Sequence, residues 1–174
     1  MKRGFAVIAL DQPKFDSNVG GAIRAAGCYG ADLIVASGQR FKRESTDTQK
    51  AFRHIPTIFG LDSVFDAIPI DCIPVAVEIT DDAHSLVNYR HPERAFYIFG
   101  GEDQTLGAKI LGRCRDVVYV PTTHCMNLAA TVNVVLYDRR VKELLGRGRV
   151  VEATAFEAVD AGSIPAAPAL KAVA

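Results

Sequence analysis

Three short polar segments of this 174-residue sequence hold residue types that can bind anions, admit a ligand closely or stabilise charge. The first, NVGGAIR, runs from Asn18 to Arg24 and has the pattern N-x-G-x-x-x-R. Asn18 is well placed to cap a helix that begins at Val19, and the free N–H groups at such a helix end favour phosphate. Arg24 would project from the second turn near the same end. An ordinary capped helix with a surface arginine explains these residues equally well.

The second segment, FGGEDQTLG, runs from Phe99 to Gly107 and includes the end of a short apolar stretch. Paired glycines directly after a buried strand imply that another group approaches the backbone closely at Gly100 and Gly101. Glu102 lies on the same turn and offers a carboxylate. Taken alone, a tight turn with a solvated acid is the simpler interpretation.

The third segment, VPTTHCMNL, runs from Val120 to Leu128. A proline stops the preceding strand, and Asn127 stands at the start of an apolar helix. A buried asparagine must find hydrogen-bond partners, which suits a residue that holds a loop or a ligand. The alternative is a helix cap, with Cys125 and Met126 filling the core.

These segments need a scaffold, and the apolar pattern of the chain predicts one. Continuous apolar runs of strand length alternate with stretches of helical periodicity. The predicted strands are 4–10, 32–36, 73–77, 96–99 and 116–120, and the predicted helices are 19–30, 61–67 and 126–145. This alternation predicts an α/β fold with a mostly parallel sheet and helices on both faces. Ligands bind outside the carboxyl ends of such strands, which is where the chain enters all three segments.

The composition predicts one folded domain with a tail. Hydrophobic residues make up 49% of the chain and charged residues 23%, which is enough apolar material for a real core. After Val150 the sequence shifts to alanine and proline, so we expect a domain over 1–150 and a loosely held tail over 151–174. The 20 Lys and Arg residues balance 20 Asp and Glu residues. This balance excludes a uniformly basic nucleic-acid binder but not a neutral protein with a basic face.

The sequence also argues against a membrane span, a secretion signal and a metal site. No apolar run approaches the roughly 18–20 residues of a membrane helix, and the first apolar run is too short for a signal peptide. The sequence has 4 cysteines, and no two of them form a C-x-x-C pair. We therefore expect reduced, mostly buried thiols and no structural zinc. We therefore expect a soluble, cytoplasmic protein.

The order of the three segments is more specific than any one of them. N-x-G-x-x-x-R near the N-terminus, F-G-x-E before the last helix and a V-P…x-M-N-L loop that opens it resemble the SPOUT class of RNA methyltransferases. Within that class the sequence is similar to the TrmH/SpoU type over about residues 5–145. The resemblance implies a deep trefoil knot between about Val75 and Leu145, an exception to the rule that chains are unknotted. It also implies a homodimer whose active site combines both chains.

The resemblance further implies a cofactor, a reaction and the residues that serve them. S-adenosylmethionine would donate its methyl group to a ribose 2′-hydroxyl of tRNA or rRNA. Residues at the matching positions would line the cofactor pocket, largely through backbone groups: Val77, Gly100, Gly101, Val120, Cys125 and Met126. A side chain at either glycine would fill the cofactor's space. The residues that match catalytic positions of the family are Asn18, Arg24, Glu102 and Asn127.

Arg24 matches the family's catalytic arginine, and two roles remain open for it. A guanidinium stays protonated in nearly all settings, so action as a general base would need a strongly perturbed site. We favour an electrostatic clamp that positions the ribose or a neighbouring phosphate and stabilises developing oxyanion character. Asn18 would fix the loop and hydrogen-bond near the acceptor ribose.

Two residues depart from the family pattern. Cys125 stands where the family usually has serine, and Thr105 stands where it usually has glycine. These departures leave a second function open, namely a non-catalytic RNA-binding or assembly protein that retains the knotted fold. A nucleotide-binding oxidoreductase is disfavoured because the G-x-G-x-x-G fingerprint is absent.

Residues 39–54 are polar and basic and predict a long exposed loop that binds RNA. They include five Lys or Arg residues against two Asp or Glu residues, a net charge of about +3. Phe41 and Phe52 are interleaved with them and can stack on bases. A solvated surface is the alternative for any basic run. The residues that we expect to contact RNA are Arg40, Lys42, Arg43 and Arg53.

Overall fold

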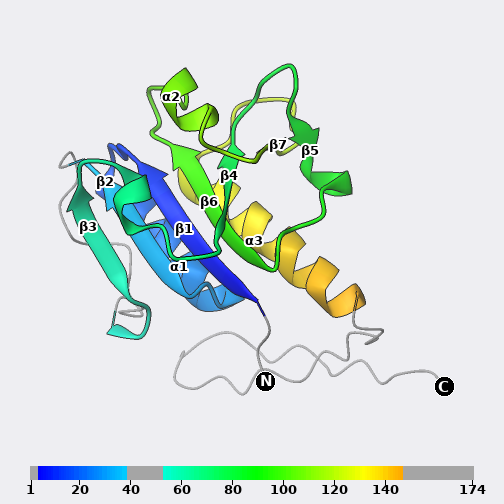
Figure 1. Cartoon of the computed structure of the whole chain (residues 1–174), viewed down its shortest axis with the longest axis horizontal. Helices are drawn as coiled ribbons and strands as arrows, with labels where there is room; N and C mark the ends of the chain where they lie inside the picture. The colour runs from blue at the N-terminus through cyan, green and yellow to red at the C-terminus, as the bar shows by residue number, and fades with distance from the viewer. Residues whose placement is uncertain (1–3, 39–52, 147–174) are drawn as a thin grey trace, which may run out of the picture. The chain divides into compact units, whose positions relative to one another are not determined.

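The computed structural model describes residues 4–38 and 53–146. Helices are interspersed among the strands along these residues, as expected of an α/β fold (Figure 1). The strands are β1 (Phe5–Asp11), β2 (Leu33–Ser37), β3 (Thr57–Leu61), β4 (Ile73–Val77), β5 (His84–Ser85), β6 (Arg94–Gly100) and β7 (Asp116–Tyr119). The α-helices are α1 (Asp16–Tyr29), α2 (Ala108–Leu111) and α3 (Leu128–Leu145), and the 3₁₀ helices are η2 (Val64–Ala67) and η3 (Leu86–Asn88).

The strands form one seven-stranded sheet in the order β3-β2-β1-β6-β4-β7-β5. Every neighbouring pair is parallel, so the predicted α/β fold with a mostly parallel sheet is confirmed. The longest register joins β1 to β6, from Phe5 opposite Arg94 to Asp11 opposite Gly100. Both strands lie inside the sheet and are continuously apolar between their ends, as burial on both faces requires.

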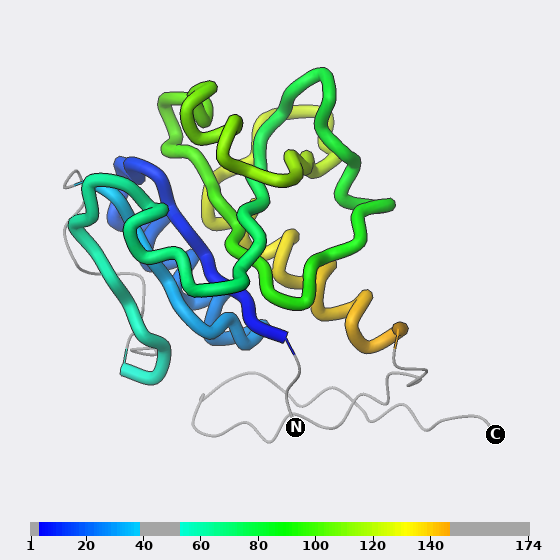
Figure 2. The backbone as a smooth tube through the Cα atoms, viewed as in Figure 1, coloured from blue at the N-terminus to red at the C-terminus, as the bar shows by residue number. Residues whose placement is uncertain are grey.

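The strand order brings together parts of the chain that are far apart in sequence. From β1 the chain passes through α1 to β2 and β3 on one side, whereas β6, β4 and β7 build the other side (Figure 2). The carboxyl ends of β1, β6 and β7 reach the same edge because the strands are parallel. The three polar segments of the sequence follow these three strands, so the fold gathers them at one edge.

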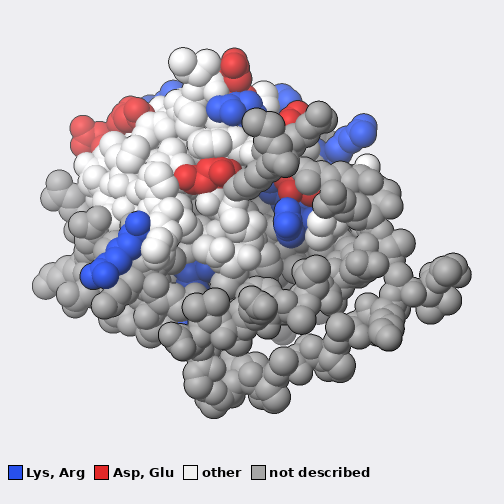
Figure 3. Space-filling view, turned by 90° about the horizontal axis from the view of Figure 1, so that it is seen from below, with Lys and Arg blue, Asp and Glu red and all other residues white. Residues whose placement is uncertain are grey.

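Charged side chains of both signs are mixed on the surface. The face drawn in Figure 3 shows Lys and Arg beside Asp and Glu rather than a surface of one sign. Two ion pairs within the described residues illustrate the mixture: Lys14 Nζ lies 3.1 Å from Asp103 Oδ2, and Arg115 Nη2 lies 2.9 Å from Asp116 Oδ2. This mixture agrees with the zero net charge of the chain.

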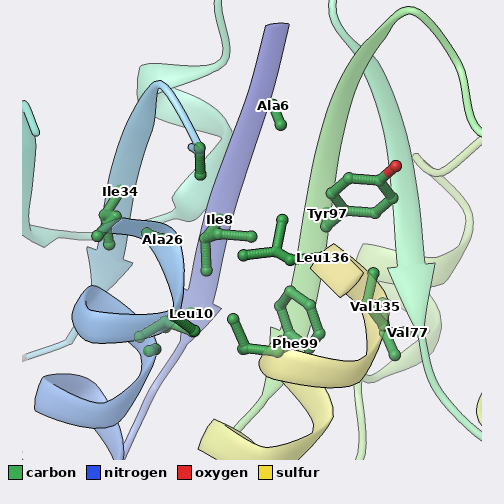
Figure 4. Packing of buried hydrophobic residues seen from close by; sticks show 14 of the residues in the cluster. Ala6, Ile8, Leu10, Ala26, Ile34, Val77, Tyr97, Phe99, Val135 and Leu136 are labelled. Carbon is green, nitrogen blue, oxygen red and sulfur yellow. The ribbon is translucent and has the colours of Figure 1, made fainter. Parts of the chain in front are cut away.

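The core lies on both sides of the sheet, and the longer helices cover one side. Figure 4 shows Ile8 of β1 and Tyr97 of β6, both fully buried, beside Ala26 of α1 and Leu136 of α3. The predicted arrangement of helices on both faces is confirmed, although only short helices cover the second face. Those helices, η2 and α2, pack there through Val64, Phe65, Ile110 and Leu111.

The start of α1 differs from the prediction made from the sequence. The helix begins at Asp16, and its N-cap residue, Phe15, makes no side-chain cap hydrogen bond. The prediction that Asn18 caps the helix is therefore wrong: Asn18 lies in the first turn, and its amide is buried against other segments. The helix end is as predicted, because Gly30 has a φ of 73° and donates its N–H to the Ala26 carbonyl.

Several other elements also depart from the prediction, most clearly an edge strand and the last helix. The sequence pattern missed β3, whose burial alternates between half-buried and exposed residues along an edge of the sheet. Such a strand has a weak apolar pattern, and Gly60 with a φ of 75° interrupts it. The last helix begins at Leu128, two residues later than expected, because Asn127 caps it.

The chain divides into two compact units, Met1–Asp138 and Arg139–Ala174. Within the described residues of the second unit, Glu143 forms ion pairs with Arg139 at 3.2 Å and with Arg140 at 3.7 Å. The predicted tail, 151–174, lies outside the described residues.

The cysteines are all free thiols, as predicted. Cys28 and Cys125 are exposed, however, so the prediction of mostly buried thiols is wrong for these two. Within residues 4–38 and 53–146, none of the helices has the length and apolar character needed to cross a membrane.

A buried imidazole joins β6 to α3. The side chain of His91 is 4% exposed and lies between the Tyr97 hydroxyl, 2.6 Å from Nδ1, and the Asp138 carboxylate, 2.8 Å from Nε2. Tyr89 packs edge-on against this ring and donates its hydroxyl to Asp116 at 2.8 Å. Burial, together with the bond to Asp116, raises the pKa of Tyr89 well above its usual range, so the hydroxyl stays a donor.

We predict that His91→Phe lowers the free energy of unfolding by about 1–3 kcal/mol. The phenyl ring fills the space but leaves the Tyr97 hydroxyl and the Asp138 carboxylate without this partner. Urea unfolding followed by circular dichroism measures the change. The matched control is His54→Phe at an exposed position, for which we expect a change below about 0.5 kcal/mol. An H91F variant as stable as the wild type would show that the imidazole is dispensable to both partners.

Candidate functional site

A cavity of about 650 Å³ opens at the carboxyl ends of β4, β6 and β7. Its wall comes from the last residues of these strands and from the first residues of α1 and α3. Parallel strands favour a hollow at this edge because the loops that leave them diverge. The volume lies within the range of ligand clefts, about 300–1,000 Å³.

Most of the residues singled out in the sequence line this cavity. The predicted cofactor contacts on its wall are Val77, Gly100, Gly101, Val120, Cys125 and Met126. Three of the predicted catalytic residues, Asn18, Glu102 and Asn127, are there as well. Arg24 is not on this wall: it is exposed on α1, six residues after Asn18. The cavity of one chain therefore includes the predicted cofactor contacts without the predicted guanidinium.

A chain of hydrogen bonds joins the three polar segments along the cavity wall. Asn127 Nδ2 donates to Asn18 Oδ1 at 2.6 Å, and Asn18 Nδ2 donates in turn to Glu102 Oε1. The second carboxylate oxygen, Glu102 Oε2, accepts from the backbone N–H of Lys14 at 2.8 Å. Both oxygens of Glu102 are thus engaged by the segment that follows β1.

Asn127 has a second function in the same chain of bonds. Its Oδ1 accepts from the backbone N–H groups of Ala129 at 2.9 Å and Ala130 at 3.2 Å, so it caps α3. The alternative interpretation of Asn127 as a helix cap is correct, and it holds together with the interpretation as a residue that binds another segment. One side chain fixes the start of α3 and links it to α1.

Glu78 is a residue of the cavity wall that the sequence analysis missed. It directly follows β4, and its carboxylate accepts from the backbone N–H of Ile79 at 2.9 Å and of Leu106 at 2.8 Å. The second bond holds the far end of the loop that begins at Gly101. The only sequence feature that marks Glu78 is an acidic residue immediately after an apolar strand, which is too common to be diagnostic.

Glycines at this edge are needed for contacts within the chain. A Cβ at Gly101 would lie 2.5 Å from the Gln12 carbonyl oxygen, and a Cβ at Gly100 would lie 3.2 Å from the Gln104 carbonyl oxygen. The nearest obstacle to a side chain at either glycine is thus the protein's own backbone, and the expectation that it would also fill the cofactor's space stays a prediction. A Cβ at Gly21 would likewise lie 2.7 Å from Cβ of Ala129, where α1 meets α3.

Comparison with known families agrees with the motif order. The model of the SpoU rRNA methylase family matches residues 6–137, which is most of the chain. The chain belongs to this family. The resemblance to the TrmH/SpoU type is thereby confirmed. Comparison with curated proteins finds no match by sequence.

Solved structures of SpoU-type proteins share the fold. AviRb, a SpoU methyltransferase from Streptomyces viridochromogenes, is 17% identical and superposes with a TM-score of 0.71 over 85% of this chain and 63% of AviRb. AviRb has also been solved in complex with AdoMet. The TrmH/SpoU tRNA modifying enzyme of A. aeolicus is 13% identical, with a TM-score of 0.73 over 84% of this chain and 79% of that enzyme. The family member described here thus spans about 63% of the length of AviRb.

The predicted RNA contacts of this SpoU-family chain are only partly within the described residues. Arg40, Lys42 and Arg43 lie outside them. Arg53 is described and is exposed in the turn before β3. Its part in RNA binding stays a prediction. Among residues 4–38 and 53–146, no group of three or more His, Cys, Asp or Glu side chains is placed to hold a metal ion.

We predict that Gly21→Ala destabilises this SpoU-family protein and that Ala129→Gly compensates. The added Cβ meets Ala129 at 2.7 Å, and overpacking of this kind costs about 1–3 kcal/mol. The exchange is balanced for helix propensity, since one helix gains the roughly 1 kcal/mol that the other loses. A double-mutant cycle of unfolding free energies therefore isolates the contact, and we expect G21A/A129G to be more stable than the two single changes together predict. Additive effects would mean that α1 and α3 move apart freely.

Proposed function

We propose that the chain is an S-adenosylmethionine-dependent methyltransferase that modifies a ribose 2′-hydroxyl of tRNA or rRNA. The observation that supports this most strongly is the hydrogen-bonded series from Asn127 through Asn18 to Glu102 on the wall of one cavity. They are three of the four catalytic positions that the SpoU resemblance marks, and Asn18 lies 84 residues from Glu102 and 109 residues from Asn127 along the chain. Mass analysis of nucleosides from methylated RNA distinguishes ribose from base methylation.

The cavity fits a cofactor that is part apolar and part polar. Val77, Val120 and Met126 supply apolar wall, whereas the turn at Gly100 offers backbone groups. Its volume of about 650 Å³ is ample for a molecule of nucleoside size with an amino-acid tail. When bound there, S-adenosylmethionine supplies an electrophilic methyl group on its sulfonium. The chain's own residues must then orient the acceptor and stabilise its developing charge.

Glu102 and Asn18 serve to hold the site in place. Both carboxylate oxygens of Glu102 accept hydrogen bonds, from Asn18 and from the Lys14 backbone, which suits a group that holds the loops together. The amide nitrogen of Asn18 donates to Glu102, and its amide oxygen accepts from Asn127. None of these three side chains is a cation, so the positive charge that stabilises the acceptor oxygen has to come from elsewhere, and Arg24 is our candidate. A permanent cation suits an electrostatic clamp better than a proton acceptor.

We propose further that the working form is a homodimer. Arg24 is exposed and lies off the cavity wall of its own chain. An isologous pair of chains would let Arg24 of one copy complete the cavity of the other, as the resemblance implies. In such an assembly each site needs both chains, and a monomer would be inactive.

The segment from about Val75 to Leu145 is proposed to form a deep trefoil knot. In support, the chain after β4 and the chain after β7 share one cavity wall, at Glu78 and Ile79 on one side and Val120 on the other. The β6-β4-β7 order of the sheet places these two stretches together (Figure 2). If one of these stretches passes through the loop formed by the other, the two sides of the cavity wall are held together without a disulfide.

We predict that Arg24→Ala lowers methyl transfer by at least about 100-fold, because one charge-stabilising donor is typically worth that much. Cofactor affinity should stay within about 3-fold, since the proposed clamp acts on the acceptor ribose or a neighbouring phosphate and not on the cofactor. Transfer of a radioactive methyl group to RNA measures the first and calorimetry the second. Arg24→Lys retains the charge without the planar fork and should be intermediate. Full activity of R24A would remove Arg24 from the mechanism.

Mixing two inactive variants tests the shared site. R24A retains its cavity, whereas Val120→Trp, at a half-buried position of the cavity wall, should block the cavity and leave Arg24 in place. Random pairing then produces mixed dimers with one intact site, so activity should return to about a quarter of wild type. A mixture as inactive as its components, at concentrations where both variants are dimeric, would mean that each chain uses its own Arg24.

We predict that S-adenosylmethionine protects Cys125 from alkylation. Cys125 is exposed on the cavity wall. Cys28 is also exposed, but it lies on α1 and not on the cavity wall. Burial raises the pKa of Cys114 to about 11, so that thiol stays protonated at pH 8, and Cys72 is buried. At ten times the dissociation constant, the cofactor should slow the reaction of Cys125 about 10-fold. Peptide mass spectrometry measures both rates, with Cys28 as the internal control.

The same measurement separates the enzyme from the alternative raised by Cys125 and Thr105. Equal rates with and without millimolar cofactor, together with no heat in calorimetry, would favour a non-catalytic RNA-binding or assembly protein. A Cys125→Ser variant, which restores the usual residue of the family, should bind the cofactor at least as tightly as the wild type because a hydroxyl is the better hydrogen-bonding group.

A further inference from the structure

Gln12 has a backbone conformation that residues other than glycine rarely adopt. It directly follows β1 and has a φ of 51°, in the left-handed region. For a residue other than glycine this conformation costs about 1–2 kcal/mol. Such a conformation persists only where neighbouring contacts hold it, and it often occurs where a chain must be aimed at a site.

Buried polar groups hold Gln12 in this conformation. Its backbone N–H donates to Ser37 Oγ at 3.1 Å, and Ser37 Oγ donates to Asp11 Oδ1 at 2.8 Å. Ser37 is fully buried at the end of β2. The Gln12 side chain lies against Gly38, where a Cβ would meet its Oε1 at 2.4 Å. The ends of β1 and β2 therefore fix Gln12 from two directions.

The backbone that follows this kink contacts the Glu102 turn at two points. The Gln12 carbonyl oxygen lies 2.5 Å from where a Cβ of Gly101 would be, so the two backbones touch directly. Two residues later, the Lys14 N–H donates to Glu102 Oε2 at 2.8 Å. Gln12 itself is not on the cavity wall, whereas Gly101 and Glu102 are.

We infer that Gln12 is a positioning residue, whose left-handed backbone aims the Lys14 N–H at Glu102 and seats the Gly101 turn. Through Glu102 the same contact sets the amide of Asn18, and through Asn18 it reaches Asn127. The inference deepens the proposed function and rests on it for its effect on methyl transfer. The placement of Lys14 against Glu102 is a property of the chain alone and can be tested without a cofactor.

The first experiment uses the amide proton of Lys14 as a reporter. A backbone N–H that donates to a carboxylate resonates downfield, and Glu102→Gln should move that resonance because it removes the charge. We expect Gln12→Val, which disfavours a positive φ, to move it in the same way. Gln12→Gly and Gln12→Asn both tolerate the left-handed region and should retain the wild-type shift. Should Q12V fail to fold, Gln12→Ala takes its place with a smaller backbone penalty.

The second experiment measures function in the folded variants, well below their melting temperatures. We expect Q12V to lower kcat/KM for RNA by about 10-fold or more, as small misplacements of a site do, and Q12G and Q12N to stay within about 3-fold. A merely structural residue would lower the melting temperature without changing either the Lys14 resonance or kcat/KM. That result, or a Q12G variant that loses the Lys14 resonance as Q12V does, would overturn the inference.

The outcomes also separate this inference from the proposed function. If the wild type neither binds S-adenosylmethionine nor methylates RNA, the proposed function fails, and the Lys14 resonance still decides the part of Gln12. If the wild type is active and Q12V retains the resonance and the activity, the inference on Gln12 fails alone.

Discussion

The side-chain amide of Asn18 is the contact on which the site depends. An amide has one accepting oxygen and one donating nitrogen, and here each faces a different segment of the chain. The direction of the bonds follows from the neighbours. Asn127 must use its oxygen on the free N–H groups of α3, so only its nitrogen is left for Asn18. Glu102 can only accept, so it takes the nitrogen of Asn18. An aspartate in place of Asn18 would set two carboxylates against each other.

This contact is possible only because the backbones around it come unusually close. Gly21 lets α1 approach the first turn of α3, and Gly101 lets the turn after β6 approach the chain after β1. Short polar side chains such as asparagine span little distance, so a separation of one more methyl group would break the series. Gly21 and Gly101 therefore allow the close packing of these segments. The cavity lies between the segments that this packing brings together.

The sequence predicts the scaffold better than it predicts the site. Long apolar runs such as those of β1 and β6 identify buried strands by themselves, and the edge strand β3 has no such run. The three motifs were expected to meet because parallel strands share an edge. The local pattern wrongly predicts that Asn18 caps a helix, because its partners, 84 and 109 residues away, decide where its side chain turns. Glu78 and Gln12 have no local pattern, since their roles depend on a backbone amide or a glycine supplied by another loop.

The span of 109 residues between Asn18 and Asn127 also sets when the pocket can exist. During synthesis the N-terminal half of the chain leaves the ribosome first and can assemble β1, α1 and β2, while the amide of Asn18 is still hydrated. Glu102 reaches this amide first, and only the arrival of α3 brings Asn127 to it and completes the wall. A product truncated before α3 therefore lacks one side of the cavity wall and exposes the apolar face that α3 covers in the complete chain.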